Sequence, residues 1–398
     1  MPPLLQILNR LPKLIDDVFP LPGRFRVGLG RDIAELSRLL TSGRGDRGVS
    51  YLGRPALLSA YLRYFLPWNI YRLSRLLPVM PLELKANDAV NDFGAGPLTL
   101  AASLWICRPE LRNIPLEFRC LDRTPAIMDA GKKIFSALAT AYPPGDKNNS
   151  SCPWIVKTIR GELKRNGTLS VEIRGNPAAL SAALNVYNEL FWDFSQGNTE
   201  ELRRFAGNHA RLLSSLTSSQ GSILVVEPGI PRSGEFISLL RASLITEGRS
   251  PIAPCTHSSP CPIPGGRLET GAKAKWCHFA YDTEDAPEAL HRHSVSAKLP
   301  KERAVLSYIL AANKQGETFQ KMPAGKIKPE KIRVISDPFP VDKHWGRYGC
   351  GESGLILVTG SREDIKVSAS GKLEELTPNG ERDAKSGALV AEVFPGVS

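Results

Sequence analysis

The order of segments between residues 88 and 122 constrains the fold of this 398-residue chain more than any other feature. A short apolar run, Ala89–Phe93, precedes a glycine turn, Gly94-Ala95-Gly96-Pro97, and Leu98–Trp105 then has the composition of a buried helix. A second apolar run, Leu116–Leu121, ends directly before Asp122. Strands that alternate with helices form a parallel sheet with helices on both faces. This order therefore predicts the first half of a doubly wound, Rossmann-like α/β fold.

The same alternation continues to about residue 250. Further candidate strands are Ile155–Ile159, Leu169–Ile173 and Gly221–Glu227, and Ala183–Leu190 is expected to be a buried segment. Apolar residues at helical spacing predict helices over Thr124–Ala139, Thr199–Leu216 and Gly234–Ile245. In the first of these helices, Thr124 is the expected N-cap and Pro125 the first residue.

The two ends of the chain have different patterns. Residues 1 to about 85 carry apolar residues at helical spacing, interrupted at Pro67. Arginines alternate with aromatic residues there, which fits either a phosphate-binding surface or a solvated face opposite a core face. Beyond residue 250, Ala304–Ala312 is a short helix or strand, and the β-like runs are Lys331–Ser336, Leu355–Thr359 and Ala388–Phe394. We expect three parts: a helical region (1–85), a Rossmann-like domain (86–250), and a cysteine-rich, β-containing module (251–398).

The glycine turn has the form D-x-G-x-G, made by Asp92, Gly94 and Gly96. Glycines let a backbone approach a ligand closely, and the helix that follows offers free amide groups. An acid at the end of the second strand, here Asp122, can accept hydrogen bonds from ribose hydroxyls.

The third glycine of the motif separates two classes of cofactor. A dinucleotide-binding turn has it at position 99, where this chain has Thr99. The methyltransferase form has it at position 98, where this chain has Leu98. S-adenosylmethionine, which carries no phosphate, therefore suits this turn better than a nicotinamide dinucleotide.

Three of the seven cysteines lie in residues 253–279, hereafter the cysteine stretch, with the spacing C-x5-C-x15-C (Cys255, Cys261, Cys277). A fourth, Cys350, lies 73 positions further on. Four thiolates can close a metal or iron–sulfur site. Free cysteines are also often small buried apolar residues, whereas an odd total fits complete disulfide pairing poorly. The spacing does not match common zinc fingers, and by itself it leaves zinc and iron–sulfur both open.

Charge and hydropathy limit the partners. The formal net charge of +11 favours a polyanion, and nucleic acid is the commonest such partner. No run of about 18 apolar residues is present, so we expect no membrane span. The first residues lack the basic start and cleavage site of a secretory signal. With the unpaired cysteine count, this predicts a reducing, intracellular compartment.

Taken together, the motifs resemble one family, the methyltransferase-like proteins and assembly factors of the mitochondrial small ribosomal subunit and their bacterial relatives. The resemblance covers roughly residues 5–360, and the cysteine series is its specific part. The motifs are Asp92–Pro97, Asn188-Glu189-Leu190, Val226-Glu227-Pro228-Gly229, Pro254-Cys255-Thr256-His257, Cys261-Pro262 and Trp276-Cys277-His278-Phe279.

The resemblance implies a class I methyltransferase core that binds S-adenosylmethionine and a 4Fe-4S cluster held by Cys255, Cys261, Cys277 and Cys350. It also implies association with small-subunit ribosomal RNA and ribosomal proteins, in the bacterial cytoplasm or the mitochondrial matrix. The cofactor residues that it suggests are Asp92, Gly94, Gly96, Pro97, Asp122, Asn188 and Glu227.

Two activities fit this resemblance: methyl transfer to small-subunit ribosomal RNA, or a non-catalytic role in ribosome assembly. The chain lacks the N/D-P-P-Y tetrad with which base-amino methyltransferases hold their target. It also lacks the C-x3-C-x2-C motif of radical S-adenosylmethionine enzymes, so we expect the cluster to be structural.

Overall fold

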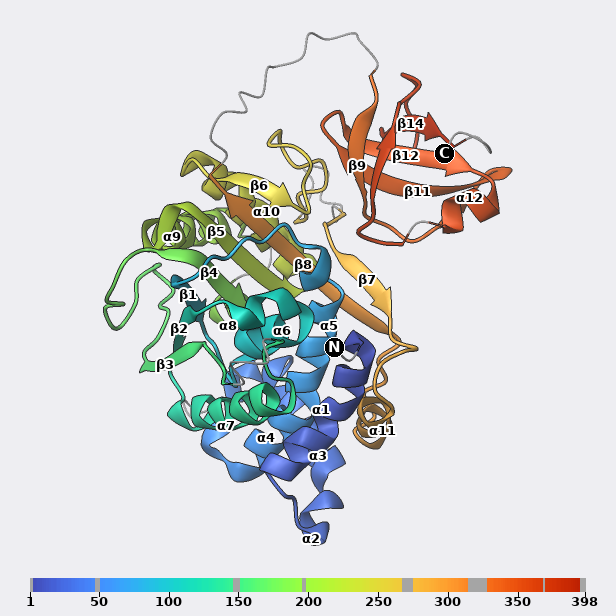
Figure 1. The fold of residues 1–398 in the computed structure, drawn as a ribbon. Coiled ribbons are helices and arrows are strands. Elements are labelled where there is room, and N and C mark those ends of the chain that lie inside the picture. Colours follow the sequence, from blue (N-terminus) through green and yellow to red (C-terminus); the bar gives the residue numbers. More distant parts are fainter. Residues whose placement is uncertain are drawn as a thin grey trace. The chain divides into compact units, whose positions relative to one another are not determined.

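A computed structural model describes residues 3–46, 51–145, 151–194, 198–266, 275–313, 328–367 and 369–393 (Figure 1). The chain forms two compact units, each made of several segments. The first unit contains Met1–Asp193, Leu216–Ser218 and Asp282–Ala304, and the second contains Phe194–Ser215, Ser219–Tyr281 and Val305–Ser398. The division into three parts that the sequence suggested stays a prediction. Within the described residues, no helix combines the length and apolar character that crossing a membrane requires.

The N-terminal part of the first unit is helical, as predicted. Its elements are α1 (Leu4–Val18), α2 (Gly23–Arg26), α3 (Leu29–Leu40), η1 (Arg44–Asp46), η2 (Tyr51–Gly53), α4 (Pro55–Ala60), η3 (Tyr61–Phe65), α5 (Leu66–Ser74) and η4 (Leu77–Val79). The chain stays helical through Pro67, which has no N–H to donate, because η3 is a π turn in which the Leu66 N–H bonds to the Tyr61 carbonyl.

The aromatic residues of this region form a core face. Tyr64, Trp68 and Tyr71 are almost fully buried. Of the interleaved arginines, Arg63 is also buried and forms an ion pair with Asp16 at 2.8 Å. The core interpretation of the alternating pattern therefore holds for these residues.

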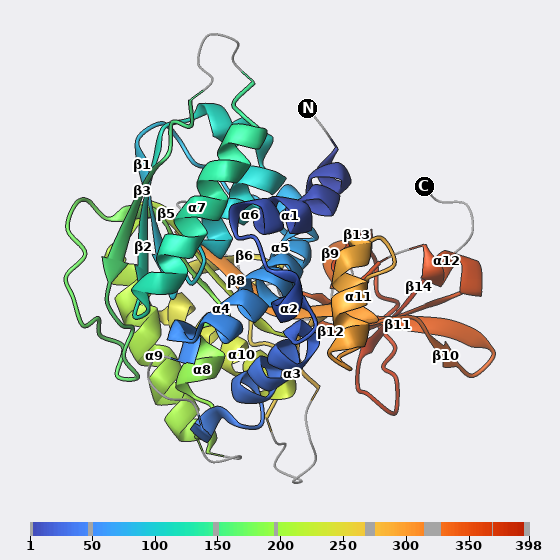
Figure 2. The same ribbon diagram turned by 90° about the horizontal axis from the view of Figure 1, so that it is seen from below.

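The first unit also contains a parallel sheet in the order β3-β2-β1-β4. Its strands are β1 (Asp88–Phe93), β2 (Leu116–Asp122), β3 (Ile155–Arg160) and β4 (Ala178–Leu184). The helices and turns between and after them are α6 (Thr99–Cys107), η5 (Pro109–Asn113), α7 (Pro125–Ala141), α8 (Tyr187–Leu190) and α11 (Glu288–Ser296). Helices α6 and α7 pack on this sheet, and α1 packs on both helices (Figures 1 and 2).

The predicted strand at Leu169–Ile173 is wrong. Leu169 forms only an isolated bridge with Leu163, across a tight turn that follows β3. The next strand is β4, whose sequence AALSAAL is rich in alanine, a residue with low strand propensity. Burial between the strands and helices, rather than local preference, makes this segment a strand.

The second unit contains α10 (Pro231–Thr246) and β6 (Ser250–Ala253), and most of α9 (Thr199–Leu216), β5 (Thr217–Pro228), β7 (Phe279–Asp282) and β8 (Arg303–Ala312). Strand β8 lies between β5 and β6 and is antiparallel to both. The parallel order β3-β2-β1-β4 is the expected Rossmann-like half. A reversed strand between the last two parallel strands is the arrangement of class I methyltransferases, so the predicted fold class is confirmed.

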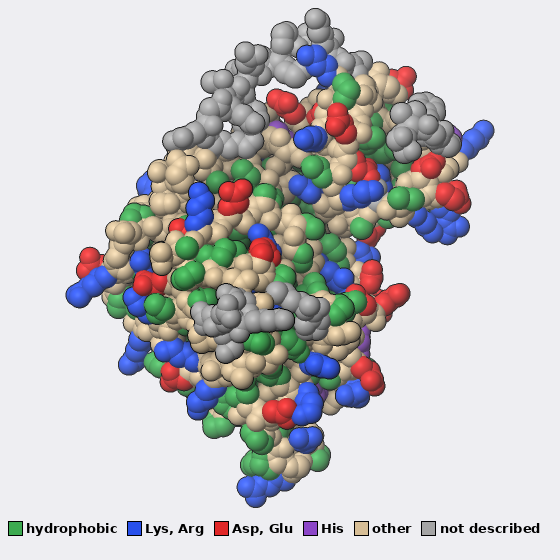
Figure 3. Space-filling view, in the orientation of Figure 1, with side chains coloured by type: hydrophobic (Ala, Val, Ile, Leu, Met, Phe, Trp, Pro, Cys, Tyr) green, Lys and Arg blue, Asp and Glu red, His purple; other side chains and the backbone are tan. Residues whose placement is uncertain are grey.

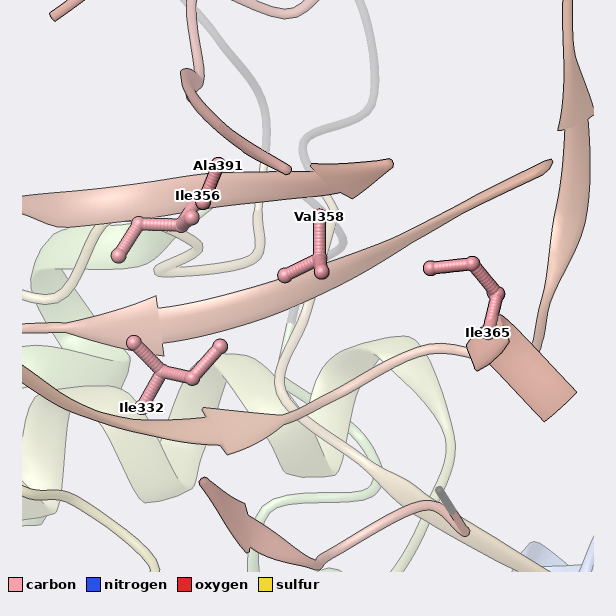
Figure 4. Close-up of a cluster of buried hydrophobic side chains, with 5 residues drawn as sticks. All are labelled: Ile332, Ile356, Val358, Ile365 and Ala391. Atoms are coloured by element: carbon pink, nitrogen blue, oxygen red, sulfur yellow. The ribbon is translucent and has the colours of Figure 1, made fainter. Parts of the chain in front are cut away.

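A separate six-stranded sheet lies in the last part of the second unit, with β13-β9-β11-β12-β14 in order and β10 on β11. The bounds are β9 (Glu330–Val334), β10 (Phe339–Val341), β11 (His344–Gly351), β12 (Gly354–Gly360), α12 (Arg362–Lys366), β13 (Leu373–Leu376) and β14 (Leu389–Glu392). Alternate residues of β12, Ile356 and Val358, share a buried cluster with Ile332, Ile365 and Ala391 (Figure 4). Of the predicted run Ala388–Phe394, Phe394 lies outside the described residues.

Candidate cofactor cavity and cysteine cluster

A cavity of about 600 Å³ opens in the first unit at the carboxyl ends of β1 and β2. Gly94 and Gly96 line it from the turn after β1, and Asp122 lines it from the end of β2. In open α/β sheets, ligands bind at this edge, and cavities of about 300–1,000 Å³ hold small molecules and cofactors. The structure therefore brings these three predicted residues to one cavity.

The two glycines of the turn have different roles. Gly94 has φ +65° and Gly96 has φ +52°, both in the left-handed region that favours glycine. A Cβ atom on Gly94 would lie 2.5 Å from Cγ2 of Val186, so this glycine allows close packing of two loops. A Cβ atom on Gly96 would meet nothing nearer than the Tyr61 hydroxyl at 3.9 Å. Gly96 therefore leaves open space at the cavity, where a ligand can approach the backbone.

The Asp122 carboxylate holds the turn against β2. Its Oδ2 accepts a hydrogen bond from the Gly96 amide at 3.0 Å, and its Oδ1 accepts one from the Thr124 amide at 2.8 Å. Burial raises the pKa of Asp122, and these two amide bonds oppose that rise. Thr124 does precede α7, but its side chain makes no capping hydrogen bond. Asp122 instead bonds the Thr124 amide.

Asp92 is a buried acid behind the turn. It is 1% exposed, and within the described residues its Oδ2 has no hydrogen-bond partner. Burial, with a further contribution from the charge of Asp122, raises the pKa of Asp92 well above its usual value. A protonated carboxyl can donate a hydrogen bond as well as accept one.

Asp92 and the three remaining predicted cofactor residues are not among the described residues that line the cavity. The backbone of Pro97 packs closely on Gly131 of α7. Asn188 is buried in α8, and its carbonyl accepts a hydrogen bond from Arg44. Glu227 is fully buried near the end of β5, in the second unit. Their role at a cofactor stays a prediction.

Several cavity residues were not found from the sequence. Strand β4 ends at Leu184, so Asn185 and Val186 line the cavity after it, rather than the later Asn188. Asn185 has φ +56°, a conformation in which asparagine is enriched, so the asparagine itself was the sequence signal of a turn. Tyr61 and Trp192 also line the cavity, and the sequence carries no local sign of this.

The four predicted metal ligands all lie in the second unit. Cys255 and Cys261 follow β6, Cys277 precedes β7, and Cys350 is in β11. Burial raises the pKa of Cys277, and the charges of the other three cysteines raise it further, so the four sulfurs are close enough to interact. All seven cysteines are free, which removes the disulfide alternative. Within the described residues, no group of three or more His, Cys, Asp or Glu side chains has metal-site geometry.

Two further side chains contact these sulfurs. Arg241 of α10 donates from Nε to Cys255 Sγ at 3.2 Å. His257 is 1% exposed, and its Nε2 lies 3.4 Å from Cys350 Sγ. Burial, with a smaller contribution from Arg241, lowers the pKa of His257 to about 4, so this histidine is neutral at pH 7. The loop after β6 is thereby bonded to both α10 and β11.

Residues 199–352 match the family model described as mitochondrial small ribosomal subunit Rsm22. No curated protein matches the chain. The range that matches the family model, residues 199–352, contains α9, β5, α10, β8 and all four candidate ligand cysteines.

Three of the similar solved structures are methyltransferases. One is a methyltransferase from Thermoplasma acidophilum, with 11% identity over 58% of this chain and 70% of that chain, and a TM-score of 0.31. Another, from Haloferax volcanii, is in complex with the Trm112 methyltransferase activator (11% identity, 63% of this chain, 90% of that chain, TM-score 0.30). The third is a geranyl diphosphate methyltransferase with sinefungin bound, with 11% identity over 73% of this chain and 100% of that chain, and a TM-score of 0.32.

The fold assignment rests on the strand order, and these structures add no separate argument to it. The family match covers the cysteine series, which is the specific part of the resemblance. The match over residues 199–352 therefore confirms the resemblance to the methyltransferase-like family of the mitochondrial small ribosomal subunit.

Proposed function

We propose that the cavity beside Gly96 and Asp122 binds S-adenosylmethionine. In this proposal the chain acts on small-subunit ribosomal RNA during assembly of the small ribosomal subunit. The open space at Gly96, next to the Asp122 carboxylate, is the observation that carries the proposal.

The residues around the cavity have distinct proposed roles. Each Asp122 oxygen accepts one amide bond and keeps a lone pair for a ribose hydroxyl. Asp92 would hold the methionine end or a water beside it, and its unsatisfied buried oxygen supports this role. Pro97, Asn188 and Glu227 complete the proposed set. The bound cofactor supplies a methyl group on a sulfonium, and the transfer depends on positioning and in-line geometry more than on acid–base help.

The proposed partners are small-subunit ribosomal RNA and ribosomal proteins. The family match and the net charge of +11 support them. Lys and Arg side chains are spread over the face seen in Figure 3 rather than gathered in one patch. In a eukaryotic source the proposed location is the mitochondrial matrix, and in a bacterial one the cytoplasm.

The proposed metal centre is a 4Fe-4S cluster held by Cys255, Cys261, Cys277 and Cys350, with zinc as the alternative. Cysteine thiolates are ligands for either group, and the four free thiols, whose charges act on one another, support the proposal. The centre would tie the cysteine stretch to β11.

A second candidate is a non-catalytic assembly factor that keeps the methyltransferase fold. Leu98 favours it, since this position has φ +57° and the methyltransferase pattern places a glycine here. Its fully buried side chain makes the turn part of the core.

Isothermal titration with S-adenosylmethionine, followed by transfer of labelled methyl groups to small-subunit RNA, separates these possibilities. Binding with transfer supports the enzyme, and binding without transfer supports the assembly factor. No binding would contradict the cofactor proposal. Absorbance near 400 nm after anaerobic purification, with metal analysis, distinguishes iron–sulfur from colourless zinc.

A further inference from the structure

The side chain of Arg241, on α10, donates hydrogen bonds to the loop that carries Cys255 and Cys261. Arg241 is 4% exposed. Its Nε donates to Cys255 Sγ at 3.2 Å, and its Nη2 donates to the carbonyls of His257 at 2.7 Å and Ser259 at 2.8 Å. One guanidinium therefore fixes the backbone between Cys255 and Cys261 and contacts one of the sulfurs.

Within the described residues, Arg241 forms no ion pair with a carboxylate. Three other buried arginines each form one. Arg63 pairs with Asp16, Arg119 with Glu117, and Arg347 with Glu374. A buried cation is costly unless an anion compensates it. The side-chain atom that Arg241 contacts is instead the Cys255 sulfur, one of the four candidate metal ligands.

A second guanidinium approaches from the C-terminal sheet. Arg333 donates from Nε to the Pro254 carbonyl at 2.9 Å, next to Cys255. It is also directly opposite Cys350 in the pairing of β9 with β11. Cross-strand partners in an antiparallel pair share one face of the sheet. Positive charge thus approaches the cluster of sulfurs from two elements.

We propose that Arg241 is a positioning residue for the proposed metal centre: it fixes the loop that carries Cys255 and Cys261, donates a hydrogen bond to the Cys255 sulfur, and offsets the negative charge of the filled site. This inference rests on the proposed metal centre. Four thiolates carry twice the charge of a divalent ion, so such a site stays net negative when filled. Hydrogen bonds to the sulfurs and nearby charge set both metal retention and, for a cluster, the reduction potential.

The test compares Arg241→Gln with a matched control, Arg249→Gln, in the full chain purified anaerobically. Arg249 is also a buried arginine of the second unit, and it donates hydrogen bonds to the carbonyls of Gly221 and Ser214. The readout is the iron or zinc that remains bound as the concentration of a chelator, ethylenediaminetetraacetate, is raised. Loss of a partner of a metal ligand typically weakens binding about 10–100-fold. We expect that loss for Arg241→Gln, and less than about a twofold change for Arg249→Gln.

Two further readouts separate an electrostatic role from a structural one. Arg241→Lys keeps the charge and should recover part of the lost metal retention. If the metal is iron, the midpoint potential of the centre should become more negative in Arg241→Gln and stay unchanged in Arg249→Gln. Should Arg241→Gln not fold, Arg241→Lys against Arg249→Lys makes the same comparison of metal retention.

The outcomes are distinct. A wild-type chain without bound metal would contradict the proposed centre itself. Wild-type protein with metal, but equal retention in the Arg241 and Arg249 variants, would leave the centre in place and overturn the role of Arg241. A lysine variant no better than the glutamine variant would show that charge is not the cause, which also overturns the proposal.

Discussion

Alanine substitution at the two glycines of the turn distinguishes a packing glycine from a ligand-binding one. Both have positive φ, so an alanine costs about 1–2 kcal/mol at either position. At Gly94 the new Cβ would also lie 2.5 Å from Cγ2 of Val186, a β-branched side chain with little freedom to move. Overpacking of this kind adds about 1–3 kcal/mol, which makes a total of about 2–5 kcal/mol for Gly94→Ala.

Gly96→Ala should have the smaller effect on stability and the larger effect on binding. Its Cβ would meet no atom within 3.8 Å, so the expected loss of stability is about 1–2 kcal/mol. The same methyl group would occupy the space that the proposal assigns to S-adenosylmethionine, and we expect at least about tenfold weaker binding, or 1.4 kcal/mol. Gly248→Ala is the control, because Gly248 has φ +79° and nothing within 4 Å of its Cβ position.

Urea unfolding and isothermal titration of the three variants measure both quantities. Gly96→Ala and Gly248→Ala should unfold at similar urea concentrations, and only Gly96→Ala should lose affinity for the cofactor. Equal affinity in these two variants would refute the ligand-facing role of Gly96. A destabilisation of Gly96→Ala as large as that of Gly94→Ala would refute the packing argument.

Three further predictions concern the buried groups. Leu98→Gly relieves a left-handed backbone but removes a fully buried side chain, so we expect a net loss of about 1–4 kcal/mol in urea unfolding; a gain in stability would contradict this. The pKa of Asp92 is raised in the folded state, so its contribution to stability is present below its unfolded pKa and is lost as pH rises toward the folded value. Asp92→Asn should therefore be more stable than wild type at pH 8 and not at pH 3.5, and the same difference at both values would refute the assignment. Arg347→Leu removes the ion pair between the buried Arg347 and Glu374 and should destabilise the second unit by about 1.5–3 kcal/mol, whereas the surface variant Lys13→Leu should stay within about 1 kcal/mol of wild type.

Local patterns in the sequence predicted the first half of the sheet well. Short-range signals predicted the elements between residues 88 and 122, which are a strand, a glycine turn, a helix and a second strand. These signals are the apolar runs, the glycines, which have positive φ in the structure, and the acid at the end of the second strand. Helix α9 also has the predicted bounds, Thr199–Leu216, because its apolar face is regular. These features depend on neighbours along the chain.

The rest depends on contacts between distant segments. Strand β4 is rich in alanine, and its position between other elements decides its conformation. The sequence predicted only a buried segment over Ala183–Leu190, without a strand end at Leu184, so Asn185 was not recognised as a cavity residue. The contribution of Tyr61, which comes from the N-terminal helical region, follows only from the packed structure. Likewise, no short motif indicates that Arg241 contacts Cys255.

Titration of the wild-type chain with S-adenosylmethionine tests the central claim most directly. We expect saturable heat for one site per chain, and the same site should bind the demethylated product, S-adenosylhomocysteine. A flat titration with both compounds, for protein whose unfolding transition shows that it is folded, would contradict the account of the cavity.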